Sequence, residues 1–399
     1  MFKNTKFSGK PIISQIINFL NNTDISRTAN KHKSDRYYKR FKTKDHLISM
    51  LYVVLSGCNS LREIESIILA CEGRINHLGL NSIPKRSTLS DANRKRSSEV
   101  FCSIYFELYA RYRSLLSDSK SKTQVPKHLQ IIDSTTIRLF SEILRGVGRN
   151  PMTGKKKGGI KIHTLMNSNE DVPTFVKFTS ANVSDHKFLK YAPLKRNSLV
   201  AIDRGYNDYK QFRKWTKDGI HFVTRLKKNA VYKTLEEYDI DDNVDAGVLK
   251  DEKIELEDKE GTIELRLVTY WDDKNKKLYH FLTNNFDYSP DIIAAIYKKR
   301  WQIELLFKRL KQNFPLKYFL GDTQNAIEIQ IWTCLIAQLI ILIIQKSAQK
   351  QWSFSNLMSV IRFHLMTYID LIKFMNNPTA GWNQLKTKDD YQEQLFGFT

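Results

Sequence analysis

The hydrophobic pattern of this chain changes its period at Pro126, and this change limits the folds that are open to it. Before that residue the apolar positions recur at helical spacing, so we expect residues 1–125 to be all helical. After it the chain is rich in Ile, Val, Thr and Phe, as strands are. The expected strands are residues 129–140, 159–167, 172–180, 199–206 and 221–227. Short helical patterns precede the last two of them. Strands in a row followed by alternating helices and strands predict a mixed α/β sheet flanked by helices.

A second group of strand patterns, at 263–271 and 277–285, predicts a β-rich insertion over residues 228–290. Between Glu236 and Glu260 this insertion holds twelve acids and only three lysines. That surface is either kept away from a polyanion or is an ordinary solvated face. We therefore expect three regions. They are a helical region over 1–125, an α/β region over 126–346 that contains the insertion, and a helical region over 347–399.

The charge of the chain restricts its partners. Its 399 residues carry a net charge of +22, which calls for a polyanion or an anionic membrane surface. Nucleic acid fits better, because no helix has the pattern of a basic interfacial anchor. Residues 27–44 interleave eight cations with aromatic residues, as suits a nucleic-acid backbone or a solvated linker. The helical patterns that follow fit a helix-turn-helix as well as any small helical bundle. We expect the N-terminal region to bind DNA.

The apolar segment from Ile331 to Ile344 raises the question of a membrane. It has 14 residues, whereas a transmembrane helix needs about 20. We predict a buried core helix, with a transmembrane helix as the alternative. The N-terminus shows no signal-peptide pattern, and the four cysteines form no C-x-x-C pair. A cytoplasmic protein without a membrane partner is therefore expected.

Four polar residues share one face of a helical pattern near residue 300. At about 100° per residue they fall within about 60° of one another. They are Tyr297, Arg300, Glu304 and Lys311. A carboxylate between two cations and a phenol suits a metal ion beside a phosphodiester. Arg300 and Glu304 are also an ordinary i,i+4 pair, which on a solvated helix contributes only about 0.2–0.5 kcal/mol.

Two further carboxylates lie on expected strands. Asp133 stands in the middle of the first strand among isoleucines, where an acid needs a partner. The partner is a metal ion or, alternatively, Ser134 or Thr135. Asp203 ends the fourth strand, where ligands of α/β sheets gather, although an Asp that leads into a turn is common. If those strands lie side by side and the helix of Glu304 packs against them, the three acids converge. Such oxygen ligands suit Mg²⁺, and two ions can serve an in-line phosphoryl displacement.

Two other motifs receive structural interpretations. His163 lies on the second expected strand, and we interpret it as a structural histidine. Ser184, Asp185 and His186 have the residue types of a catalytic triad. The segment is more typical of a helix start with Ser184 as the N-cap.

In these motifs the chain resembles DDE transposases of bacterial insertion sequences. The resemblance is to the group with a Y-x2-R-x3-E-x6-K signature (insertion-sequence family four). The four places of that signature are occupied by Tyr297, Arg300, Glu304 and Lys311. The D-x-G-Y motif and the first Asp of the group are matched by Asp203, Gly205, Tyr206 and Asp133. The resemblance covers residues 126–320, and the long interval before Glu304 fits the β-rich insertion of the group.

The resemblance implies a ribonuclease-H-like catalytic domain. It implies an enzyme that cleaves DNA strands and transfers them with two Mg²⁺ ions, which Mn²⁺ can replace. Asp133, Asp203 and Glu304 would be the catalytic residues and the metal ligands. The group's DNA-binding positions correspond to Tyr297, Arg300 and Lys311.

The resemblance also implies how the reaction runs. The ends of an insertion sequence would be bound, cleaved and joined to target DNA by cut-and-paste, through hairpin ends. Family members act as homodimers in a synaptic complex, and a place at the bacterial nucleoid follows. In relatives an aromatic residue of the insertion stabilises a flipped base, and Trp271 is a candidate here.

Two other functions stay open from the sequence. A nuclease of the same fold would use the acids without strand transfer, but it would not need Tyr297, Arg300 and Lys311 in this register. A catalytically inactive DNA-binding regulator would keep the basic N-terminal region without requiring the acids.

Overall fold

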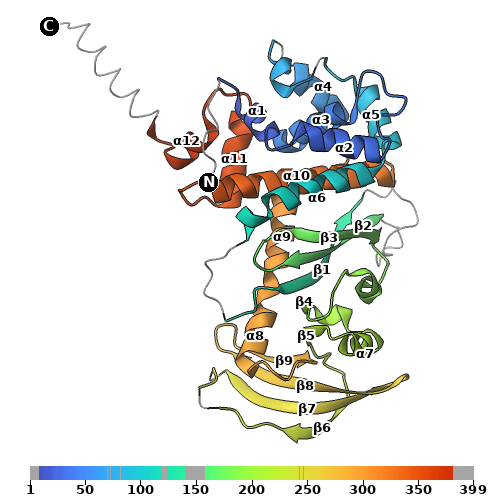
Figure 1. Cartoon of the computed structure of the whole chain (residues 1–399), viewed down its shortest axis with the longest axis vertical. Coiled ribbons are helices and arrows are strands. Elements are labelled where there is room, and N and C mark those ends of the chain that lie inside the picture. Colours follow the sequence, from blue (N-terminus) through green and yellow to red (C-terminus); the bar gives the residue numbers. More distant parts are fainter. Residues whose placement is uncertain are drawn as a thin grey trace, which may run out of the picture. The chain divides into compact units, whose positions relative to one another are not determined.

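The computed structural model describes residues 9–69, 71, 73–80, 82–117, 124–139, 158–241, 243–245 and 247–380 (Figure 1). The chain forms two compact units, one of residues 1–116 with 309–399 and one of residues 117–308. The helices after residue 309 thus share a unit with the N-terminal helices, whereas the sequence suggested separate regions at the two ends. As domain boundaries, the limits at 126 and 346 stay a prediction.

The unit of residues 117–308 is built on one nine-stranded sheet. Its strands are β1 (Leu129–Arg138), β2 (Gly159–Asn167), β3 (Pro173–Ser180), β4 (Leu199–Ile202), β5 (His221–Arg225), β6 (Tyr232–Glu237), β7 (Val248–Asp258), β8 (Gly261–Asp272) and β9 (Lys277–Thr283). The order across the sheet is β3-β2-β1-β4-β5-β9-β8-β7-β6. All five strands predicted before residue 228 are present, two to four residues shorter at some ends.

The first five strands have the ribonuclease-H-like arrangement. β1, β2 and β3 form an antiparallel meander, while β4 pairs parallel to β1 and β5 parallel to β4. The first and fourth strands therefore lie side by side, which is the arrangement that lets Asp133 and Asp203 converge. The mixed α/β sheet with helices on both faces is confirmed.

The two faces of this sheet are covered by different helices. Alternate residues of a strand point to opposite faces. Val200 and Ile202 of β4 belong to a core with Phe212 and Trp215 of α7 (Tyr209–Lys217). Leu199 and Ala201 of β4 belong to a second core, with Ile293 and Ile296 of α8 (Pro290–Lys299). The same alternation places Asp133 and Asp203 on the face that α8 covers.

The insertion extends the sheet instead of forming a separate module. β9 pairs antiparallel with β5, so β6 to β9 continue the ladder of the first five strands. The two strands predicted at 263–271 and 277–285 are confirmed. β6 and β7 were not predicted, because acids fill this segment and acids are poor strand formers. Packing decides here: Ile254 and Leu256 of β7 are buried between charged neighbours.

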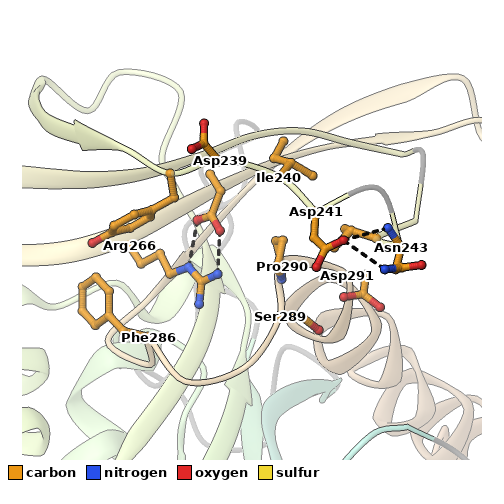
Figure 2. Close-up of a pocket in the computed structure, with 12 residues that line it drawn as sticks. Asp239, Ile240, Asp241, Asn243, Arg266, Phe286, Ser289, Pro290 and Asp291 are labelled. Carbon is orange, nitrogen blue, oxygen red and sulfur yellow. Dashed lines mark hydrogen bonds and ion pairs between the residues drawn. The ribbon is translucent and has the colours of Figure 1, made fainter.

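A buried ion pair lies in the insertion, beside a pocket of about 570 Å³ (Figure 2). Arg266 of β8 donates to both carboxylate oxygens of Asp251 of β7, at 2.8 and 2.5 Å. A third nitrogen of Arg266 donates to the carbonyl oxygens of Tyr288 and Asn285. Both side chains of the pair are almost wholly buried. Every nitrogen of this guanidinium therefore has an acceptor.

The other unit is helical. Its helices are α1 (Ile12–Ile17), α2 (Asn22–Lys31), α3 (Thr43–Ser56), α4 (Leu61–Leu69), α5 (Arg86–Lys95), α6 (Ser98–Leu116), α10 (Gln324–Ser347), α11 (Phe354–His364) and α12 (Leu371–Asn376). The helical N-terminal region is confirmed. α10 contains the apolar segment and, at 24 residues, is long and apolar enough to cross a membrane. Of its most apolar window 94% is buried inside the protein, as in the core helix that the sequence predicted.

Candidate active site

Three polar residues occupy one row of the parallel strands. The pairing joins Ile132 to Ile202 and Ala201 to Val223. One step beyond Ile132 and Ile202 come Asp133 and Asp203, and two steps beyond Ala201 and Val223 the register reaches Asp203 and Arg225. They share the face that α8 covers, because side chains alternate along each strand. The sheet thus brings two of the predicted acids together, with an arginine beside them.

The third acid comes from the helices on that face. The sequence predicted one continuous helix, but α8 ends at Lys299 and α9 (Trp301–Asn313) begins two residues later. Around Arg300 the backbone hydrogen bonds tighten from i−4 to i−3. Tyr297 and Arg300 are only 3% and 4% exposed, so they are not part of a solvated helix face. Glu304 follows on α9, one turn after Arg300.

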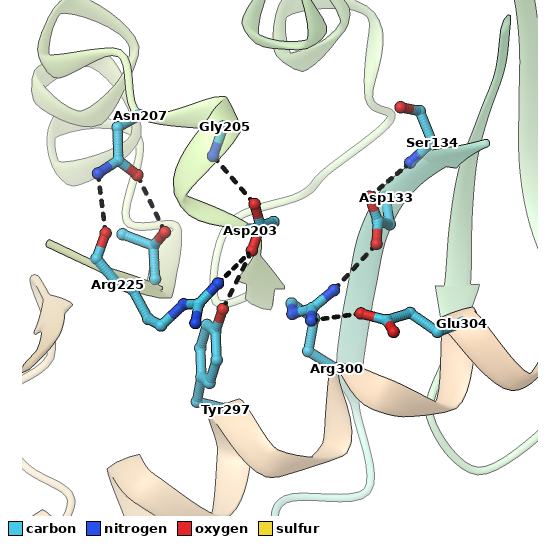
Figure 3. A network of polar contacts seen from close by, with 10 residues as sticks. Asp133, Ser134, Asp203, Gly205, Asn207, Arg225, Tyr297, Arg300 and Glu304 are labelled. Carbon is cyan, nitrogen blue, oxygen red and sulfur yellow. Dashed lines mark hydrogen bonds and ion pairs between the residues drawn. The ribbon is translucent and has the colours of Figure 1, made fainter. Parts of the chain in front are cut away.

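Arg300 connects two of the acids (Figure 3). Its Nη1 donates to Oδ2 of Asp133 at 2.9 Å, and its Nη2 donates to Oε1 of Glu304 at 2.6 Å. The other oxygen of Asp133, Oδ1, accepts from the backbone N–H of Ser134 at 2.7 Å. The Glu304 side chain remains 37% exposed, whereas that of Arg300 is 5% exposed. One guanidinium therefore donates to two carboxylates, of which Asp133 is 17% exposed and Glu304 is 37% exposed.

Asp203 has a separate set of donors (Figure 3). Arg225 donates to its Oδ1 at 3.0 Å, and the Tyr297 hydroxyl donates to the same oxygen at 3.3 Å. The backbone N–H of Gly205 donates to Oδ2 at 3.2 Å. This last bond places Asp203 at the cap of a short 3₁₀ turn, which explains the D-x-G-Y spacing.

The two strand acids differ in their proton affinity. Burial raises the pKa of Asp133 to about 7, and the attraction of Arg300 only partly opposes this. Burial also acts to raise the pKa of Asp203. There the Gly205 N–H, Arg300 and Arg225 outweigh it, so that pKa lies below its ordinary value. Burial raises the pKa of the Tyr297 phenol to about 12, so the phenol keeps its proton.

A cleft of about 940 Å³ contains the three acids. Arg225, Tyr297, Arg300 and Trp301 line it together with the acids, and so do residues of β8 and β9. Trp301 is 58% exposed. Trp271, near the end of β8, is exposed as well. Lys311 is exposed on α9, about two turns after Glu304, and belongs to the other compact unit.

A second cleft, of about 920 Å³, shares Asp133 with the first. There the hydroxyl of Ser134 donates to Oδ1 of Asp185 at 2.7 Å, and Lys161 donates to the same oxygen at 3.0 Å. Ser134 therefore links Asp133 through its N–H to Asp185 through its hydroxyl. No sequence motif predicts this link. Ser184 does precede the helical turn, as predicted, but its side chain makes no capping hydrogen bond.

His163 has the surroundings of a structural residue. It is fully buried, stacks on Phe188 with ring centroids 4.9 Å apart, and shares a hydrogen bond with Thr179 at 2.9 Å. Burial lowers its pKa to about 4, so the imidazole is neutral at pH 7. Its approach to Asp185, at 4.0 Å, is not an ion pair in that state.

Sequence reasoning missed two residues of the site, Arg225 and Asp185. Arg225 ends a strand that runs parallel to that of Asp203, and a cation at such a strand end was the available signal. Asp185 gave no such signal, because its partners Ser134 and Lys161 lie on two other strands.

The donor set at the first cleft suits a divalent cation. Asp133, Asp203 and Glu304 offer carboxylate oxygens, the ligands that Mg²⁺ and Mn²⁺ prefer. Among the described residues, no three Asp, Glu, His or Cys side chains lie close enough together to hold one ion. Arg300 instead bonds Asp133 and Glu304, and Arg225 bonds Asp203. A cation at these acids would therefore compete with two guanidinium groups.

A family model covers the part of the chain that holds the three acids. The family model described as "Transposase DDE domain" matches residues 126–340, more than half of the chain. A domain of unknown function matches residues 8–81. The chain therefore belongs to the family of DDE-domain transposases, whose members generally use divalent metal ions.

The relatives narrow this to the transposases of bacterial insertion sequences. A Synechocystis protein named as the transposase of element IS4SA is 30% identical over 66% of this chain and 73% of its own length. A Sinorhizobium fredii protein named as transposase y4zB is 29% identical over 64% of this chain and 70% of its own length. The piggyBac transposase synaptic complex with hairpin DNA covers 95% of this chain and 84% of its own chain, at 11% identity and a TM-score of 0.42. That likeness is too slight to bear on function.

Proposed function

We propose that this transposase binds the ends of its insertion sequence, cleaves them by metal-dependent phosphoryl transfer and joins them to target DNA. The proposed route is cut-and-paste through hairpin ends, as in the Y-R-E-K signature group. The observation that supports this most directly is that one cleft holds Asp133, Asp203 and Glu304 together with Arg225 and Arg300. Carboxylates alone would repel a phosphodiester, and the arginines supply the attraction.

In this proposal the three acids are the catalytic residues and the ligands of two Mg²⁺ ions, which Mn²⁺ can replace. When bound, the ions supply Lewis acidity to the attacking and leaving oxygens of an in-line displacement. Asp133 must lose its proton to become a ligand, and its raised pKa makes that step depend on pH near neutrality. Asp203, with its lowered pKa, is ionised throughout that range.

The cations of the cleft take the phosphates. Arg300 exchanges its carboxylate partners for phosphate oxygens, to which a planar guanidinium donates in pairs. Tyr297 keeps its proton and offers a hydroxyl to the same phosphate. Lys311 is exposed and binds the DNA backbone further along α9. Trp271 is the candidate for holding a flipped base.

The proposal includes the assembly and the place of action. Two copies bind the two ends as a homodimer in the synaptic complex, and the basic N-terminal helices recognise the ends. The chain works in the bacterial cytoplasm at the nucleoid, without a membrane partner.

Excision in cells tests the proposed function. The gene with its native flanks is placed on a donor plasmid, and wild type is compared with Glu304→Ala. The matched control is Glu264→Ala, which removes an exposed glutamate of the insertion that pairs with Lys253. We expect excised donor with wild type and Glu264→Ala, and none with Glu304→Ala.

Purified protein with Mg²⁺ and flank DNA then separates the functions. Asp133→Ala should abolish strand cleavage and leave end binding largely intact, and loss of both together would contradict the role of Asp133. Cleavage by wild type without any joined donor–target product would identify a nuclease. End binding without metal-dependent cleavage would identify a DNA-binding regulator.

A further inference from the structure

A groove not described above opens beside the cleft of the three acids. It has a volume of about 610 Å³ and lies where β5 leads into β6, next to the first residues of β9. Arg225, Lys277 and Tyr279 line both the groove and the acid cleft. The two hollows therefore adjoin at these three side chains. We call the hollow of about 610 Å³ the basic groove.

The charges of the basic groove are all of one sign. Its titratable lining comprises Arg204, Arg225, Lys227, Lys228, Lys277 and His280 together with two tyrosines, and none of the described carboxylates lines it. Arg225 is held by Asp203. Within the described parts of the chain, none of Arg204, Lys227 and Lys228 forms an ion pair with an acid. Such a concentration of cations needs an anionic partner to offset its repulsion.

Other cations of the same sheet do have acid partners. Lys250 pairs with Glu237 at 3.7 Å, and Lys253 pairs with Glu264 at 2.7 Å. Twelve acids lie between residues 236 and 260, so partners are plentiful in this insertion. The groove is nevertheless lined without them. The acidic surface of the insertion and the cationic lining of the groove are thus separate, and only the groove suits a polyanion.

The groove also offers apolar surface. Tyr232 is 39% exposed and Leu278 is 44% exposed, and Leu226 and Ala230 complete the apolar lining. Cations beside exposed rings and aliphatic groups suit unpaired nucleotides, whose phosphates meet the cations while their bases lie on the apolar groups. A duplex presents mainly phosphates and sugars to such a groove, and it leaves the apolar lining without a partner.

Arg225 connects the groove to the site. Its guanidinium bonds Asp203 at 3.0 Å and lies 5.5 Å from the ring of Tyr297 and 6.0 Å from that of Tyr279. Tyr297 belongs to the acid cleft, whereas Tyr279 lines both hollows. A strand whose phosphate lies at Asp203 therefore meets Arg225 first and the lysines of the groove next.

We propose that the basic groove binds the DNA strand next to the cleaved phosphate as unpaired nucleotides, with phosphates on Lys227, Lys228 and Arg204 and bases against Tyr232 and Leu278. This inference rests on the proposed function, since it names where the substrate of that site continues. It assigns the groove to a strand that has left the duplex and not to the intact helix.

Binding by the full chain tests the groove without relying on cleavage. The double variant Lys227→Gln/Lys228→Gln is compared with wild type and with the matched control Lys250→Gln/Lys253→Gln. The probes are a labelled oligothymidylate and the same strand as a duplex with oligoadenylate, followed by fluorescence anisotropy over a salt series. Losing two single-strand phosphate contacts should lower the salt slope by about 1.4, which at 0.1 M salt is roughly 25-fold weaker binding. The control should bind as wild type does.

A cross-linking experiment separates the groove from the cations of the helical unit. An oligothymidylate that carries 5-iododeoxyuridine should cross-link to the peptide of Tyr232 or Tyr279, and less so in the Lys227→Gln/Lys228→Gln variant. Equal weakening of single strand and duplex would overturn the assignment to unpaired nucleotides. An unchanged affinity for the single strand, or cross-links confined to the helical unit, would show that the groove does not bind DNA. Excision by wild type but not by Glu304→Ala would uphold the proposed function in either case.

Discussion

Two buried arginines of the same sheet unit form ion pairs with aspartates, and they differ in how fully they are satisfied. In the insertion, Arg266 bonds one aspartate with two nitrogens and backbone carbonyls with the third. At the cleft, Arg300 divides its bonds between Asp133 and Glu304, and its Nε is buried without a hydrogen-bond partner among the described residues. The first pair is closed. The pairs of Arg300 include an Nε without an acceptor among the described residues and a partly exposed acid, Glu304. Arg300 can therefore exchange its partners.

The difference separates stability from function. A buried charge pair contributes little net stability over an apolar replacement, but removing one partner leaves an uncompensated charge. Arg266 and Asp251 have no other charged partner within the described residues, so each depends on the other. Arg300 instead bonds two acids with one nitrogen each, and Asp133 also accepts a hydrogen bond from the backbone. Selection for a ligand site explains that arrangement better than selection for stability does.

The largest effect should come from breaking the closed pair. Arg266→Met leaves Asp251 buried without a counter-charge, and we expect a loss of about 3–5 kcal/mol in the free energy of unfolding. Urea unfolding followed by tryptophan fluorescence measures it. The double variant Arg266→Met/Asp251→Leu should recover most of the loss, and a double variant as unstable as the single one would contradict this interpretation.

A smaller stability change but a large functional one should follow from Arg300→Met. Asp133 already has a raised pKa and can take up a proton, and Glu304 is partly solvated, so both acids tolerate the loss of Arg300. We expect a stability loss well below that of Arg266→Met. End cleavage should fall roughly 100-fold, because one preorganised donor to the reacting phosphate is lost. If Arg300→Met destabilised the protein as strongly as Arg266→Met, the comparison would fail.

Breaking the link from Asp133 through Ser134 to Asp185 should slow end cleavage moderately. Asp185→Asn leaves Lys161 without its counter-charge and loosens the hydroxyl of Ser134, so we expect about tenfold slower end cleavage. Mn²⁺ binding to the purified chain, followed by electron paramagnetic resonance, should weaken similarly. Ser134→Ala combined with Asp185→Asn should be no worse than the more damaging single variant, whereas additive losses would show that the two residues act independently.

A further effect should appear in the pH dependence of the metal-free chain. The folded-state pKa of Asp133 is about 7, against 3.8 for the ordinary group. Between those values the folded chain holds a proton that the unfolded chain has lost. This contribution to stability is therefore full below pH 3.8 and is lost as pH rises to about 7. The difference in unfolding free energy between wild type and Asp133→Asn should fall across that window, and a flat difference would place the Asp133 pKa near its ordinary value.

The sequence predicted the parts of the site that depend on local spacing. The acids at Asp133 and Asp203 follow from apolar strand patterns, and a mixed sheet allowed their strands to be neighbours. Arg300 and Glu304 follow from helical periodicity, although the break between α8 and α9 did not, because no proline or glycine marks it. As a candidate active site these residues remain a proposal.

The sequence could not predict contacts that arise only from the sheet as a whole. Arg225 reaches Asp203 because β5 lies beside β4, and Asp185 reaches Ser134 from the first residue of the helical turn beyond β3. β7 formed against local propensity, since buried Ile254 and Leu256 outweigh the acids around them. Each of these features depends on partners far away in the chain, and a single window of sequence carries no record of them.

The pairing of β9 with β5 has a mechanical consequence. A module joined by loops can swing, but strands joined in one ladder are held about 4.8 Å from each neighbour. The distance from Asp203 on β4 to the cleft residues of β9 and β8 is therefore set by the strand spacing, because only β5 lies between β4 and β9. Lengthening the loops of the insertion would leave this separation unchanged. The width of the cleft is therefore fixed by the sheet. Side chains that line it, such as Arg300 and Trp301, can still move and change which ligands fit.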